Sequence, residues 1–147
     1  MSDYLPSKSC LKDITLRDGT VVPLRSLIRI NPDNLVPDYE LQAPWMAVIA
    51  LEYTTIELEI EIKERSIKEM EAAASLRARK NSAGTKLTEA TVRAKAVNDP
   101  EVREAYEELW ELKREILPIS AARTAFYARK EMLISLGAEV RLDRKGQ

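Results

Sequence analysis

Apolar residues recur at helical spacing along most of the chain beyond residue 44. The first series steps by three and four residues and comprises Ile49, Tyr53, Ile56, Ile60, Lys63, Ile67, Met70, Ala74 and Arg77. Heptad spacing of this kind places the series on one face of a helix, apolar except at Lys63 and Arg77. We therefore expect a long helix over residues 44–80, preceded by a short helix starting at Pro37, because proline is favoured in a first helical turn.

A strand pattern competes with this helix between residues 54 and 62. There, isoleucine and leucine alternate with glutamate, as in a half-buried strand. The helical series, however, extends beyond both ends of this window, and glutamates stand four residues before lysine or arginine, an order that stabilises helices. Helix is therefore preferred. Leu58 and Ile62 then widen the apolar face beyond a two-helix seam, which suggests a bundle or an oligomer.

A second series predicts a long helix towards the C-terminus. It comprises Val102, Ala105, Leu109, Leu112, Ile116, Ile119, Arg123, Phe126, Lys130 and Leu133. Asp99-Pro100 is a strong start signal and Gly137 a stop signal, so we expect a helix over residues 100–136. Pro118 predicts a kink or short break just before it, because its ring removes one backbone hydrogen bond.

The connection between the two long helices carries its own signals. Gly84 suits the left-handed conformation that follows a helix end, and Thr88 suits the N-cap of a short helix through Val97. The pattern predicts a mainly α fold, in which two long helices form an antiparallel helical hairpin with a short connecting helix. Self-association is the expected way to cover the remaining apolar surface.

The first forty residues follow a different pattern. Asp18-Gly19 lies between two short β-prone segments and predicts a small β-hairpin. Residues 23–30 fit either a helical turn or an extended segment, and residues 31–34 fit a turn. We divide the chain into an N-terminal extension (1–37), a helical domain (38–137) and a basic C-terminal tail (138–147).

The amino-acid composition excludes several kinds of metal and catalytic sites. The 147 residues contain no histidine, four glycines and one cysteine, Cys10. These counts exclude a metal site built from His and Cys ligands, histidine-based catalysis and a glycine-rich phosphate loop. We therefore expect no enzyme activity, metal or cofactor, although a mechanism using glutamate and lysine stays open. The chain has neither a run of about 20 apolar residues nor a secretory signal, and a cytoplasmic protein without membrane contact is expected.

Charge is segregated along the chain although its formal sum is only -1. Between residues 73 and 96 the sequence holds one acid, Glu89, and six cations: Arg77, Arg79, Lys80, Lys86, Arg93 and Lys95. Such a cluster either contacts nucleic-acid phosphates or is a solvated helix end whose cations complement the helix dipole. Charge alone favours the second interpretation. The segment lacks aromatic residues, so DNA binding here would involve the backbone rather than base stacking.

We expect the remaining charged and aromatic residues to have structural roles. Arg123 and Lys130 are expected to pair with Glu57, Glu61 or Glu64, and the glutamates between 101 and 115 to form a solvated face. Another basic set comprises Arg123, Arg129, Lys130, Arg141, Arg144 and Lys145. The following aromatic residues are expected in the core: Trp45, Tyr53, Tyr106, Trp110, Phe126 and Tyr127.

The order of several short features resembles a known family. These features are Tyr39-Glu40, Trp45, Ser75-Leu76-Arg77-Ala78-Arg79, a Gly-containing loop, Thr88-Glu89, Asn98-Asp99 and Trp110. Over residues 38–141 the sequence is similar to the phage recombination mediator proteins of the UvsY type. It departs from that family before residue 38, where no counterpart is identified, and in its short loop.

The resemblance implies a helical homo-oligomer that forms a ring, in the cytoplasm of a phage-infected bacterium. Such a protein binds single-stranded DNA and helps load a RecA-like recombinase onto strands coated by single-strand-binding protein. The family's DNA-binding positions at the helix end correspond to Arg77 and Arg79, which reverses the preference drawn from charge alone. The alternative is a coiled-coil structural or chaperone-like oligomer that binds only proteins. An enzyme using glutamate and lysine is the third hypothesis.

Overall fold

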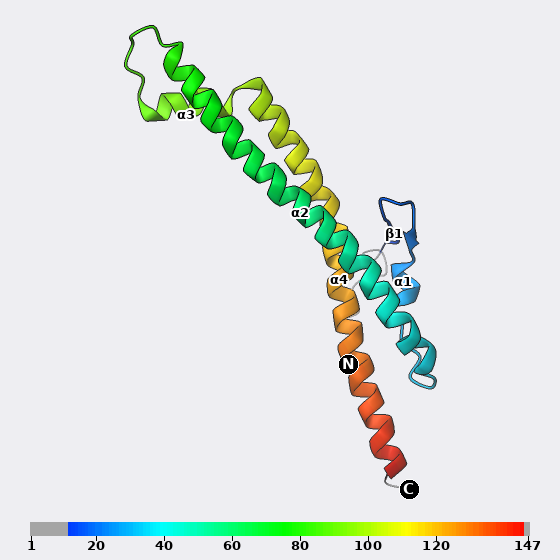
Figure 1. The fold of residues 1–147 in the computed structure, drawn as a ribbon. Coiled ribbons are helices and arrows are strands. Elements are labelled where there is room, and N and C mark those ends of the chain that lie inside the picture. The colour runs from blue at the N-terminus through cyan, green and yellow to red at the C-terminus, as the bar shows by residue number, and fades with distance from the viewer. Residues whose placement is uncertain (1–11, 146–147) are drawn as a thin grey trace, which may run out of the picture. The chain divides into compact units, whose positions relative to one another are not determined.

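The computed structural model describes residues 12–145 and is mainly helical (Figure 1). Its elements, in chain order, are β1 (Ile14–Thr15), β2 (Val21–Val22), α1 (Leu24–Leu27), α2 (Val36–Lys80), α3 (Glu89–Val97) and α4 (Pro100–Lys145). The long helices α2 and α4 pack against each other, which confirms the predicted helical hairpin and small N-terminal sheet. Residues 54–62 lie within α2, so the helical interpretation of that window is also confirmed. Cys10 lies outside the described residues.

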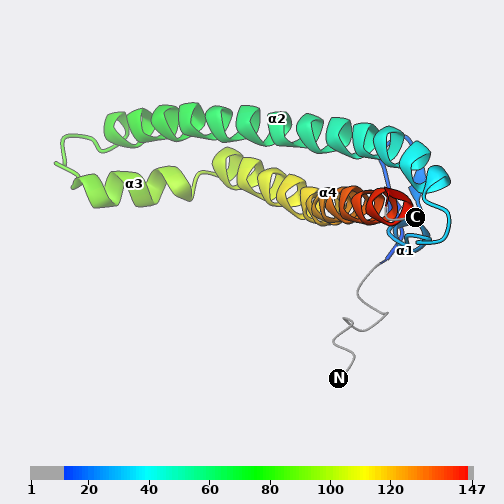
Figure 2. The ribbon, with the colours of Figure 1, turned by 90° about the horizontal axis from the view of Figure 1, so that it is seen from below.

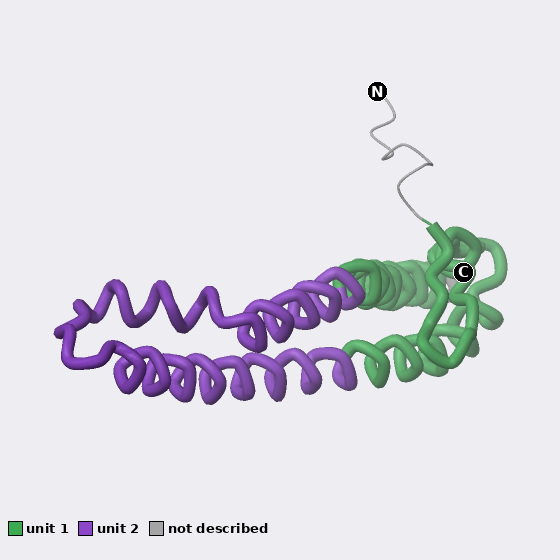
Figure 3. The backbone as a smooth tube through the Cα atoms, turned by 90° about the horizontal axis from the view of Figure 1, so that it is seen from above, with its two compact units in different colours: residues 1–53, 117–147 green, residues 54–116 purple. Residues whose placement is uncertain are grey.

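The chain divides into two compact units (Figure 3). The first unit comprises residues 1–53 and 117–147, and the second comprises residues 54–116. Both long helices therefore contribute to both units. The predicted boundaries after residues 37 and 137 both fall within the first unit, and that division of the chain stays a prediction.

The first unit contains the β-hairpin. Ile14 pairs with Val22 and Thr15 with Val21 in antiparallel register. Gly19 has a φ of 86°, and the backbone N–H of Thr20 donates to the Asp18 carboxylate at 2.8 Å. The Asp-Gly turn is thus confirmed. Residues 24–27 resolve the choice left open by the sequence, because they form the helical turn α1.

Helix α2 does not start at Pro44, as the sequence pattern predicted, but runs unbroken from Val36. Proline inside a helix costs one backbone hydrogen bond. Contacts with α4 hold the turns of α2 that precede Pro44. The Tyr39 hydroxyl donates to the Leu133 carbonyl at 2.5 Å, and the Gln42 amide donates to the Phe126 carbonyl at 2.9 Å. Packing against α4 therefore continues the helix through Pro44, where the sequence pattern predicted a new start.

Helix α4 likewise continues past Gly137 to Lys145, so the predicted end at residue 136 is wrong. Gly137 meets a packing requirement instead. A Cβ atom built at this position would lie 2.3 Å from the hydroxyl oxygen of Tyr39, which is far inside van der Waals contact. The glycine allows Tyr39 to lie directly over the helix backbone. Helix α4 is also continuous through Pro118, which excludes the predicted short break.

The second unit is built from the adjoining parts of α2 and α4 together with α3 (Figure 2). One core cluster joins Ile67 to Ala105 and Leu109, and another joins Ala74 to Ala96 and Val102. All six of these residues except Ala96 belong to the two predicted helical series. The second cluster includes α3, so it fixes the connecting helix against both long helices.

Candidate nucleic-acid interface

The cationic segment forms the end of the second unit, and we call residues 77–101 the tip. It contains the last turn of α2, a loop over residues 81–88, α3 and the first turn of α4. Ala83 and Gly84 have φ values of 43° and 83°, so the chain leaves α2 through two left-handed residues. The prediction for Gly84 is confirmed. The loop is further held by the Ser82 hydroxyl, which donates to the Arg79 carbonyl at 2.7 Å.

Helix α3 is positioned by its N-cap and its buried face. The Thr88 hydroxyl accepts a hydrogen bond from the backbone N–H of Thr91 at 3.3 Å, which confirms the predicted cap. Val92 and Ala96 are buried, whereas Arg93 and Lys95 are exposed. Residues 93 and 95 therefore lie on the solvated side of a helix that is anchored to the rest of its unit.

Arg77 connects the end of α2 to the start of α4. Its Nη2 donates to the Asp99 carboxylate at 2.8 Å and lies 3.7 Å from the Glu101 carboxylate. Asp99 also accepts from the backbone N–H of Glu101 at 3.1 Å, as expected of an N-cap. The hydrogen bond from Arg77 lowers the pKa of Asp99 below its ordinary value of 3.8, and the same contact raises the pKa of Arg77.

Arg79 connects the end of α2 to α3. Its Nη2 donates to both carboxylate oxygens of Glu89, at 2.9 and 2.8 Å. Both side chains are largely exposed, with 54% of the Arg79 side chain and 83% of the Glu89 side chain accessible to solvent. Glu89 also lies in the first turn of α3, where a negative charge interacts favourably with the helix dipole. The one acid of the cationic segment is therefore paired with a candidate DNA-binding arginine.

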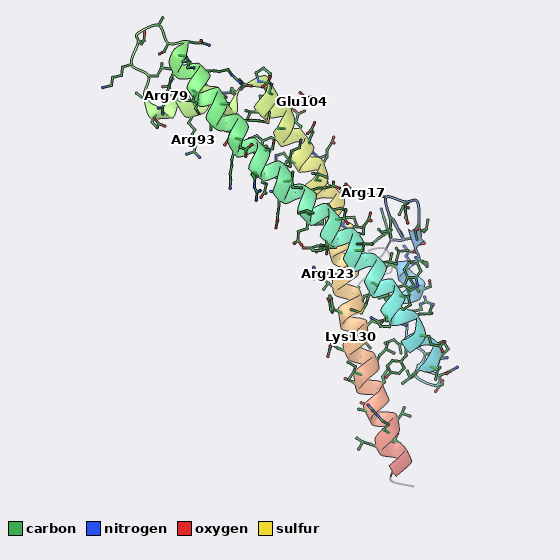
Figure 4. All side chains as sticks on the ribbon, in the orientation of Figure 1. Arg17, Arg79, Arg93, Glu104, Arg123 and Lys130 are labelled. Atoms are coloured by element: carbon green, nitrogen blue, oxygen red, sulfur yellow. The ribbon has the colours of Figure 1, made fainter. Side chains whose placement is uncertain are left out.

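The other candidate cations are exposed on three parts of the tip. They are Lys80 at the end of α2, Lys86 in the loop, and Arg93 and Lys95 on α3. Figure 4 labels Arg79 and Arg93 at this end of the unit. The structure thus brings together all six predicted cations, but it holds Arg77 and Arg79 in ion pairs within the chain. The remaining exposed lysines and Arg93 carry charges suited to contacts with phosphate groups.

Other charged residues take structural roles that the sequence pattern only partly predicted. In the second unit, Lys63 pairs with Glu108, and Lys113 binds Glu64 at 2.7 Å, lowering the pKa of Glu64. Glu64 was expected to pair with Arg123 or Lys130. Arg123, in the first unit, instead stacks over the Tyr53 ring with its guanidinium carbon 4.4 Å from the ring centre.

The buried cation of α4 is Arg129, not Lys130 as the helical series predicted. Only 3% of the Arg129 side chain is exposed, and it pairs with Asp38 and also donates to the Gln42 side chain. Lys130 is exposed. An arginine three residues after Phe126 fits the helical face equally well, but neither composition nor spacing singles it out, because its partners lie some 90 residues away in the chain.

Two aromatic residues expected in the core are exposed instead. Trp110 is 58% exposed and Tyr127 is 45% exposed, because the neighbouring Leu109 and Phe126 occupy the buried positions. Phe126 is confirmed as a core residue.

Within residues 12–145, no group of three or more acidic, Cys or His side chains is placed to hold a metal ion. None of the helices in that same range has the length and apolarity needed to cross a membrane. No protein-family model matches the chain, and neither does any curated protein or solved structure with which it was compared.

Proposed function

We propose that this protein is a non-enzymatic recombination mediator that binds single-stranded DNA through its tip. In this proposal the protein self-associates, for which a ring is the arrangement implied by the resemblance to UvsY-type proteins. It then helps a RecA-like recombinase displace single-strand-binding protein from the strand. The protein would act in the cytoplasm of the bacterial host.

The observation that carries the proposal is the exposure of Lys80, Lys86, Arg93 and Lys95 at one end of the second unit. Four exposed cations on α2, the loop and α3 offer phosphate contacts that do not depend on base sequence. Helix α3 is anchored by buried Val92 and Ala96, so the charges of Arg93 and Lys95 are presented from a fixed element.

One subunit has few contacts, so its affinity for DNA would be low. In an oligomer, a single strand would bind several tips, and each further contact would be intramolecular. Affinity would then depend on both the cations and self-association. Several exposed tips could in this way hold one long strand together.

Fluorescence anisotropy with labelled oligo-dT at several salt concentrations tests the proposal. Wild-type protein should bind at low salt and lose affinity steeply as salt increases, because binding releases counterions. A variant with the four tip cations other than Arg77 and Arg79 changed to alanine should lose most of this binding. The changes are Lys80→Ala, Lys86→Ala, Arg93→Ala and Lys95→Ala.

A matched variant removes four exposed cations that lie outside the tip. Its changes are Lys68→Ala, Arg103→Ala, Arg114→Ala and Lys130→Ala. This variant has the same net charge as the tip variant and should retain most of the binding. Equal loss in the two variants would contradict a site at the tip, and absence of binding by the wild-type oligomer at low salt would refute the proposed function.

A protein-binding role is the second candidate, favoured by exposed apolar residues on α2. In the second unit, 55% of Leu58 and 59% of Ile62 are exposed, at positions four residues apart on one helix face. This face fits a coiled-coil partner. A native mass measurement combined with the DNA titration separates the candidates, since an oligomer that does not bind DNA favours the structural or chaperone-like role.

A further inference from the structure

The two arginines of the tip are paired in different ways, although both were assigned the same role from the sequence. Arg77 is paired with Asp99, whose side chain is only 19% exposed, whereas Arg79 is paired with Glu89, whose side chain is 83% exposed. Water and ions reach the second pair far more easily. Exposed ion pairs are weak and readily exchanged.

Asp99 is further constrained by its own backbone contacts. One of its oxygens binds Arg77 while the other accepts the backbone N–H of Glu101 at the start of α4. If Asp99 released Arg77, the carboxylate would still be held as a helix cap beside the guanidinium. A phosphate competing for Arg77 would therefore meet a fixed negative charge.

Glu89 has no comparable constraint among the described residues, because both hydrogen bonds to its carboxylate come from Arg79. Its two oxygens bind a single nitrogen of the guanidinium, and a phosphate oxygen could accept a charge-assisted hydrogen bond from the same nitrogen. Rotation of the exposed Glu89 side chain would free this position without disturbing the Thr88 cap of α3.

We propose that Arg79 is a phosphate-binding residue whose site is occupied by the Glu89 carboxylate until a DNA phosphate replaces it, whereas Arg77 is a structural brace. This inference rests on the proposed function and specifies which arginine contacts DNA. Glu89 then lowers the affinity of each tip for DNA and keeps isolated subunits from binding strongly. Several tips acting together on one strand overcome this competition.

The test compares Glu89→Gln with Glu104→Gln in the anisotropy titration with labelled oligo-dT. Glutamine keeps the size of the side chain and removes its charge, and Glu104 is an exposed acid elsewhere in the second unit (Figure 4). The Glu89→Gln variant should bind about fivefold more tightly per tip at roughly 0.1 M salt, because the phosphate no longer competes with a carboxylate for Arg79. The Glu104→Gln variant should change affinity much less.

Replacement of Arg79 by alanine supplies a second measurement. In the wild-type background this change should weaken DNA binding less than in the Glu89→Gln background, because in the wild type a phosphate reaches Arg79 only by displacing the Glu89 carboxylate. In the Glu89→Gln background it should remove the whole gain in affinity. Circular dichroism checks that each variant retains its helices.

The possible outcomes separate this inference from the proposed function. If the wild-type protein binds DNA but Glu89→Gln binds no more tightly than Glu104→Gln, the phosphate-exchange role of Arg79 is wrong and the tip proposal stands. If none of these proteins binds oligo-dT at low salt, both are wrong.

Discussion

Replacing Arg129 by alanine should destabilise the first unit strongly, because it removes the cation from a buried network. The Arg129 guanidinium pairs with Asp38, donates to the Gln42 side chain and donates to the Asp38 carbonyl at 3.2 Å. It also lies 3.5 Å from the Arg29 carbonyl. One side chain on α4 thereby holds the start of α2 and the segment that leads into it.

The expected loss follows from what the alanine variant would leave behind. The Asp38 side chain is only 13% exposed. Among the described residues, it would keep one hydrogen bond from the backbone, donated by the N–H of Asn31 at 2.9 Å. Removing one partner of a buried ion pair costs about 3–5 kcal/mol, because the remaining charge is buried without compensation. Since Asp38 keeps one donor and some exposure, we expect about 3 kcal/mol.

Urea denaturation followed by circular dichroism measures this change in the free energy of unfolding. Lys130→Ala is the matched control, since Lys130 is the next residue and is exposed, and it should change the free energy by less than about 0.5 kcal/mol. The double variant Arg129→Met, Asp38→Asn removes both charges. It should be more stable than Arg129→Ala, because no buried charge is left unpaired.

A loss below about 1 kcal/mol in Arg129→Ala would refute the reasoning, as typical surface substitutions cost that little. A double variant as unstable as Arg129→Ala would also contradict it, since the instability would then come from lost packing and not from an unpaired charge. Hydrogen exchange at the Asn31 amide gives a local measurement, and its protection should fall in Arg129→Ala.

Gly137→Ala should destabilise the protein by about 1 kcal/mol, since the new Cβ displaces the Tyr39 hydroxyl from its hydrogen bond. In a Tyr39→Phe background the same change should instead stabilise by up to about 1 kcal/mol, the gain in helix propensity, and a loss of stability in both backgrounds would contradict this account. Asp99 has a pKa below 3.8 in the folded state, so its contribution to stability is present above pH 3.8 and is lost as the pH falls through its folded pKa. The difference in unfolding free energy between wild type and Asp99→Asn should therefore shrink with acidification, and a constant difference would show that the ion pair with Arg77 contributes nothing.

Local sequence signals were sufficient wherever neighbouring residues determine the structure. Helical spacing predicted both long helices and rejected the strand over residues 54–62. The Thr88 cap, the Asp99 cap and the Asp18-Gly19 turn were also predictable, because each depends on a side chain bonding a backbone group two or three residues away. The position of the cationic segment between the long helices followed from the same local signals.

Tertiary structure decided the points at which distant residues compete with these signals. Pro44 and Gly137 are helix breakers by local propensity, yet α2 and α4 pass through them because contacts between the two helices outweigh that propensity. At the tip, the sequence determined which residues carry positive charge. Only the folded chain paired Arg77 with a helix cap and Arg79 with an exposed carboxylate, since ion pairing depends on distance in space.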